Sequence, residues 1–226
     1  MTIEILGVDI VILAAYLFPV IFLMAFIGHE GKKYLIYLVW GFLASIPVII
    51  FYLLVTETFS VQYTELTVSP LLEELFKALP IIIPAIIGIK NSNRDLLVYA
   101  MAAGIGFSLL ESAWFLDLNT LTGTPDNVLT VLGESFSTTL MHGCTCGIIG
   151  YGIVLIRNFD RKALPILLFG FYTLAVTTHA IYNLLWESEN LLAIVIDFTF
   201  PLVLFFFLLT CYQVDIPSIF KRENEV

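Results

Sequence analysis

Charged and polar side chains interrupt several apolar stretches of this sequence, where they are costly unless they serve a purpose. Carboxylates and imidazoles are the side chains that most often transfer protons in enzymes, and they also bind divalent metals. The residue types therefore predict a site for acid–base or metal-assisted chemistry. In chain order, the candidates are Glu73, Glu74, Lys77, Glu111, His142, His179 and Asn183.

The spacing of these residues suits helices. Glu73, Glu74 and Lys77 share one helix face at about 100° per residue. One carboxylate can therefore pair with Lys77, while the other lies beside a like charge in a dry site, which suits a general base. The spacing leaves open which glutamate takes which role. His179 and Asn183 also share a face, so the amide is placed to orient the imidazole or a bound carbonyl.

The elements that must position these residues follow from composition. The 226 residues are 59% hydrophobic and 13% charged, which is more apolar surface than a soluble domain of this length can bury. The net charge of −9 argues against a nucleic-acid partner. We expect an all-α, polytopic membrane helix bundle that forms a single domain over residues 1–226. About seven transmembrane helices are expected, near 5–27, 34–55, 66–89, 96–116, 134–156, 163–186 and 191–212.

The orientation of the bundle follows from its basic residues, because cytoplasmic loops hold an excess of Lys and Arg. Of the ten, only Lys77 lies inside a span. The other nine fall in alternate loops and the tail, at Lys32, Lys33, Lys90, Arg94, Arg157, Arg161, Lys162, Lys221 and Arg222. This predicts an external N-terminus and a cytoplasmic C-terminus. The longest external connection is expected over 117–133, with a turn at its Gly-Thr-Pro-Asp sequence.

At about 1.5 Å per residue, the polar residues lie at one depth in the outer third of the membrane, which predicts a single polar chamber. Asp197 shares that depth, but nothing else on its span supports chemistry, so a structural role is expected.

Small residues recur every four positions on two spans and predict close helix packing. They are Ala100, Gly104, Ser108 and Ser112 on one span, and Ser135, Thr139, Gly143 and Gly147 on the next.

Taken as motifs, the candidates are Glu73-Glu74-x-x-Lys77, Phe107-x-x-x-Glu111, His142 and His179-x-x-x-Asn183. This order resembles the PrsW family of intramembrane proteases, which are relatives of the CAAX prenyl endopeptidases and of the Aph subunit of gamma-secretase. The resemblance covers about residues 66–186. It implies that the two glutamates, Glu111 and the two histidines form a catalytic centre, with Lys77 and Phe107 in support.

The resemblance implies an intramembrane endopeptidase in the cell membrane. Its substrate would be a single-pass membrane protein resembling an anti-sigma factor, cut near the extracytoplasmic face in a site-1 cleavage. Glu73 or Glu74 would activate water, and His142, His179 and Glu111 would ligate a metal such as zinc or stabilise the carbonyl. A metal-free glutamate mechanism stays open. Two other functions also stay open, a non-catalytic scaffold of the same superfamily and a proton- or cation-coupled transporter.

Overall fold

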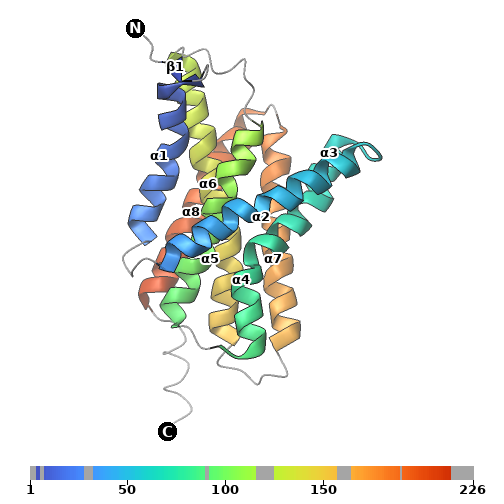
Figure 1. Cartoon of the computed structure of the whole chain (residues 1–226), viewed down its shortest axis with the longest axis vertical. Coiled ribbons are helices and arrows are strands. Elements are labelled where there is room, and N and C mark those ends of the chain that lie inside the picture. Colours follow the sequence, from blue (N-terminus) through green and yellow to red (C-terminus); the bar gives the residue numbers. More distant parts are fainter. Residues whose placement is uncertain are drawn as a thin grey trace.

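The computed structural model is a bundle of long helices (Figure 1), which confirms the all-α prediction. It describes residues 4–5, 8–27, 33–89, 92–115, 125–156, 164–188 and 190–214. A two-residue strand pair, β1 (Glu4–Ile5) and β2 (Val8–Asp9), precedes the bundle. The helical elements are α1 (Ile10–Ile27), α2 (Lys33–Thr56), α3 (Val61–Tyr63), the π-helix η1 (Thr64–Val68), α4 (Ser69–Ile87), α5 (Asn93–Phe115), α6 (Pro125–Ile156), α7 (Leu164–Trp186) and α8 (Leu191–Val214).

The seven long helices correspond to the seven expected spans. Five of them, α2, α5, α6, α7 and α8, are long and apolar enough to cross a membrane. Helix α4 is not among the five, and it carries the three charged residues Glu73, Glu74 and Lys77. The number of spans and the orientation of the termini therefore stay predictions. Most of the basic residues behind the orientation, Lys32, Lys90, Arg157, Arg161, Lys162, Lys221 and Arg222, lie outside the described residues.

Helix α6 begins earlier than the sequence suggested. The expected loop over 117–133 is wrong in its second half, because α6 already starts at Pro125. Proline is favoured at the first helical position, where its missing N–H is not needed. Pro125 and Asp126 therefore open a helix, while the two residues before them lie outside the described part of the chain.

The core of the bundle lies between α5 and α6, which are mostly buried, whereas fewer than a third of the residues of α2, α7 and α8 are buried. Helix α6 runs along the long axis, and α2 crosses the bundle obliquely (Figure 1). A Cβ at Gly104 would overlap the backbone carbonyl of His142. The hydroxyl of Ser108 lies 3.2 Å from Thr139 Oγ1. The predicted small-residue packing of these two helices is thus confirmed, and it sets the position of His142.

Side chains of the neighbouring helices α2 and α7 donate hydrogen bonds to backbone carbonyls of α4. Pro80 has no N–H, so the carbonyl of Phe76, four residues earlier, lacks its usual helical donor. The indole Nε1 of Trp40 on α2 donates to that carbonyl at 2.9 Å. From the other side, the Tyr172 hydroxyl of α7 donates to the carbonyl of Leu71 at 2.6 Å. Both contacts fix the turn that carries Glu73 and Glu74.

Candidate active site

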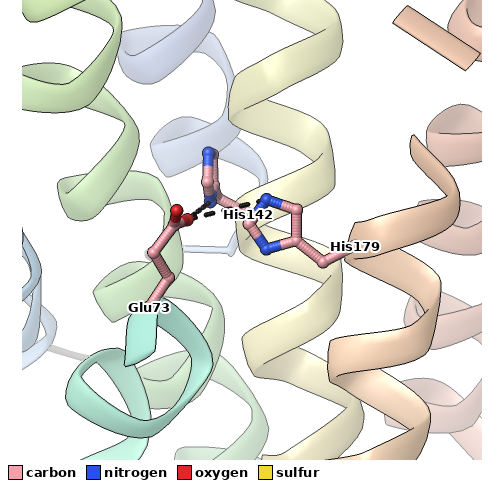
Figure 2. Close-up of side chains that lie close together, drawn as sticks. All are labelled: Glu73, His142 and His179. Carbon is pink, nitrogen blue, oxygen red and sulfur yellow. Dashed lines mark ion pairs between the residues drawn. The ribbon is translucent and has the colours of Figure 1, made fainter. Parts of the chain in front are cut away.

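Four helices bring the predicted residues together at one place. Figure 2 shows Glu73 of α4, His142 of α6 and His179 of α7 pointing toward one another. Each offers one ligand atom, and these atoms lie within 4.8 Å of one another. All three side chains are buried, with about 2% of each residue exposed. The predicted convergence of separate spans on one polar chamber is therefore present in the structure.

The two adjacent glutamates have different surroundings. Glu74 Oε1 accepts hydrogen bonds from Lys77 Nζ at 2.7 Å and from His179 Nδ1 at 2.8 Å. Because Nδ1 of His179 donates to a carboxylate, the neutral form of that imidazole has its lone pair on Nε2, 3.6 Å from Glu73 Oε2. Glu74 thus neutralises the lysine and orients the histidine from behind the site.

Of the two adjacent glutamates, Glu73 is the one that lines the cavity beside the histidines. Its Oε1 accepts a hydrogen bond from Ser69 Oγ at 2.7 Å. Within the described part of the chain, its buried Oε2 has no hydrogen-bond partner. The nearest nitrogens lie at ion-pair distances, His179 Nε2 at 3.6 Å, Lys77 Nζ at 3.9 Å and His142 Nδ1 at 4.0 Å. A buried carboxylate oxygen without a hydrogen bond is expensive, so its position points to a role in binding or chemistry.

His142 is held from both ring nitrogens. Lys77 Nζ lies 2.8 Å from Nδ1, and since an ammonium can only donate, Nδ1 accepts and the proton resides on Nε2. Nε2 in turn contacts the carboxylate of Glu111. The ring of Phe107 lies 5.4 Å from the His142 ring, and Lys77 Nζ lies 4.8 Å from the Phe107 centroid. Phe107 and Lys77 therefore fix the imidazole, as the motif order implied.

A cavity of about 360 Å³ opens beside these groups. Glu73, Glu111, His142 and His179 line it, whereas Glu74 and Lys77 are not among its lining residues. Asp197 is also absent from the lining, and its backbone carbonyl accepts a hydrogen bond from Ser137 Oγ. The remaining lining residues are Glu65, Ser69, Ser112, Val131, Glu134, Ser135, Thr138, Tyr182, Asn183, Trp186 and Glu187.

Asn183 lines the cavity but has a partner that the sequence did not suggest. Its Nδ2 donates to the backbone carbonyl of Glu65 at 2.9 Å. Asn183 therefore joins α7 to the π-helix η1, and this bond positions the segment that carries Glu65.

Several lining residues were missed in the sequence, although helical spacing carries a signal for some of them. Ser69 precedes Glu73 by four residues, and Trp186 follows His179 by seven, so each pair shares a helix face. Glu134 was missed because its position was assigned to the start of a span, next to an expected loop. Glu65 and Glu187 fall just outside the expected spans 66–89 and 163–186, where a charged residue carries no signal.

The donors fit a divalent cation. Glu73 Oε2 is buried and lacks a hydrogen bond, and the lone pair of His179 Nε2 lies 3.6 Å away. Two histidines and one glutamate form a known catalytic zinc set. The structure groups Glu73 with the histidines, while the expected ligand Glu111 contacts the second nitrogen of His142. Lys77 opposes a cation here, since its ammonium already occupies the lone pair of His142 Nδ1.

Comparison with known proteins supports the family resemblance that the motifs indicated. A family model described as PrsW family intramembrane metalloprotease matches residues 31–211. The match extends beyond the 66–186 region that the motifs alone indicated, and it includes α2 and most of α8. Searches of the curated proteins and of the solved structures found no match. With most of its length matched, including every helix that lines the cavity, the chain belongs to the PrsW family of intramembrane metalloproteases.

Proposed function

We propose that this integral membrane protein is an endopeptidase that cuts a single-pass membrane protein close to the extracytoplasmic surface, with Glu73 as the general base. Supporting this is one observation above the others: Glu73 Oε2 is buried, has no hydrogen-bond partner in the described chain and borders a cavity that holds both histidines. By family resemblance, the substrate class is an anti-sigma-factor-like protein in the cell membrane.

Hydrolysis of a peptide bond needs an activated water, a stabilised carbonyl oxygen and a proton for the leaving amine. In this proposal Glu73 takes a proton from water as the water oxygen bonds to the carbonyl carbon. The protonated Glu73 then gives that proton to the amine nitrogen as the C–N bond breaks. His179 Nε2, held by Glu74, orients the water beside Glu73. The Nε2 proton of His142, which contacts Glu111 in the structure, would be shared between Glu111 and the carbonyl oxygen.

A divalent metal would be held by Glu73 and His179, and by His142 once Lys77 no longer donates to its Nδ1. It would supply Lewis-acid polarisation of the carbonyl and a more acidic water. Zinc is the metal that this donor set most often binds.

The proposal is tested with purified protein in lipid vesicles that contain single-span reporter peptides with a randomised outer flank. We expect Glu73→Gln to lower cleavage by about 10²–10⁴-fold, because the amide cannot accept the proton from water. Its thermal unfolding should stay near wild type, since the amide keeps the shape of the side chain and can still accept from Ser69.

Asp197→Asn is the matched control, because Asp197 is another buried carboxylate on a long helix but does not line the cavity. Its cleavage rate should stay within about threefold of wild type. Equal cleavage by wild type and Glu73→Gln would reject Glu73 as the base. Lack of cleavage by a folded wild type on every reporter would favour a scaffold.

A further inference from the structure

The side chains that line the cavity include many more acidic than basic groups. Among the lining residues that the structure describes, five are glutamates and none is a lysine or arginine. The lysine closest to the site, Lys77, lies behind it and pairs with Glu74 at 2.7 Å. Independently of this excess, Glu73 Oε2 is buried without a hydrogen-bond partner in the described chain, and it borders a cavity of about 360 Å³ that has room for a ligand. The five glutamates are Glu65, Glu73, Glu111, Glu134 and Glu187.

The glutamates fall into an inner and an outer group. Glu73 and Glu111 contact or approach the histidines. Glu65, Glu134 and Glu187, here called the outer glutamates, come from three elements, η1, α6 and the turn after α7. All three are partly exposed. A substrate chain that enters the cavity from its exposed side would therefore pass them before it reaches the inner group.

The partners of the outer glutamates do not neutralise them. Glu65 Oε1 accepts from the Tyr52 hydroxyl at 2.9 Å, and Glu187 Oε2 accepts from Gln62 Nε2 at 2.7 Å. Both donors are uncharged. Burial raises the pKa of Glu65, the hydrogen bond from Tyr52 opposes the rise, and the nearby charges of Glu187 and Glu111 add to it. The carboxylates at this end of the cavity thus repel one another, and a cation would relieve that repulsion.

Resting on the proposed protease function, we propose that the outer glutamates select substrates that carry a lysine or arginine close to the scissile bond. Val131 and Trp186 supply apolar lining in the same cavity. A long aliphatic stem that ends in a positive charge matches this combination, because the stem packs on apolar surface while the charge reaches the carboxylates. A basic side chain held there would fix the register of the peptide at Glu73.

The test uses single-span peptides that a randomised outer-flank library shows to be cleaved, remade in pairs with lysine or norleucine near the cut. Norleucine keeps the length of the stem but removes the charge. We expect kcat/KM for the lysine peptide to exceed that for norleucine by about tenfold at low ionic strength, and the ratio to fall as salt screens the charges. Glu65→Gln and Glu187→Gln should each lower the ratio about threefold or more.

Glu57→Gln is the matched control, because Glu57 is an exposed glutamate just after α2 that does not line the cavity. It should leave the lysine-to-norleucine ratio unchanged. Cleavage without a preference for lysine, or a preference that survives both cavity substitutions, would overturn the selectivity while leaving the protease function in place.

A binding measurement keeps the selectivity testable if cleavage itself fails. Folded Glu73→Gln protein is titrated with the fluorescent lysine and norleucine peptides. Tighter binding of the lysine peptide, lost on adding Glu65→Gln and Glu187→Gln, supports the outer glutamates as a basic-residue site. Equal binding of the two peptides overturns it.

Discussion

The two adjacent glutamates divide catalysis and structure between them. The sequence places both on one helix face with Lys77, so it predicts that one is paired and cannot say which. The structure identifies Glu74 as the paired glutamate, because His179 and Lys77 both donate to its Oε1. Glu73 is left 3.9 Å from the ammonium and open to the cavity. Neighbours in sequence thus acquire different chemistry through a contact with His179, which is 105 positions from Glu74.

This division predicts opposite outcomes for two isosteric substitutions. Glu74→Gln removes the charge that pairs with the fully buried Lys77, and breaking such a pair costs about 3–5 kcal/mol. We therefore expect a clear fall in thermal stability for Glu74→Gln, measured by unfolding in detergent, while Glu73→Gln unfolds near the wild-type temperature. If Glu73→Gln is the less stable of the two, the assignment of roles is reversed.

A second prediction at this scale concerns the metal. If Glu73, His142 and His179 hold zinc, purified protein should contain close to one equivalent, and chelation should abolish cleavage until zinc or cobalt is restored. His179→Ala should lose the metal and the activity together. Metal content is measured by elemental analysis beside the cleavage assay.

The position of Lys77 sharpens the metal test. Its ammonium donates to His142 Nδ1 at 2.8 Å, so it competes for the lone pair that a metal would need. Lys77→Met should therefore raise the affinity for zinc, provided that the variant folds. Full activity after exhaustive chelation would instead support a metal-free site in which Lys77 is the resident positive charge.

At the scale of the helices, sequence patterns predicted where elements lie better than how they begin. The seven apolar stretches and the packing face of α5 against α6 follow from hydropathy and from small residues such as Gly104. The early start of α6 at Pro125 was missed, because polar residues and a Gly-Thr-Pro-Asp sequence resemble a turn. The π-helix η1 was also missed, since no periodicity of apolar residues marks a change from α to π hydrogen bonding.

The hydrogen bond from Trp40 to α4 also depends on tertiary structure, and its contribution can be tested. Trp40→Phe keeps an aromatic ring at this position but leaves the Phe76 carbonyl without the indole donor. Loss of a hydrogen bond to a carbonyl that lacks its usual helical donor costs about 1–3 kcal/mol. We expect lower thermal stability and reduced cleavage, because the turn with Glu73 loses a support.

Trp114→Phe provides the comparison for this substitution. Trp114 is similarly exposed on α5, at 47% against 38% for Trp40, and it does not line the cavity. Its replacement should change stability and cleavage little. Equal effects of the two substitutions would show that the loss of aromatic surface, and not the hydrogen bond to Phe76, accounts for the result.

Over the whole molecule, the basic residues of the loops and the cavity lie at opposite ends of the helices. Helix α4 starts beside Glu73 and ends shortly before Lys90, while α7 starts shortly after Lys162 and ends beside Glu187. The cavity therefore lies near the helix ends whose adjoining loops lack lysine and arginine. Because basic loops stay in the cytoplasm, this arrangement favours an active site that opens toward the extracytoplasmic side.

The last prediction tests that orientation directly. Reporter fusions after residues 60 and 188, next to the cavity, and after residue 122 should report an external location. Fusions after residues 92 and 160 should report the cytoplasm, because the neighbouring loops hold Lys90, Arg94, Arg157, Arg161 and Lys162. An alternating result of this kind also requires α4 to cross the membrane despite its three charged residues, which is plausible only because all three are buried against α6 and α7. A cytoplasmic signal at 60 or 188 would place the cavity on the inner side, and the outer cleavage of a membrane-anchored substrate would then be ruled out.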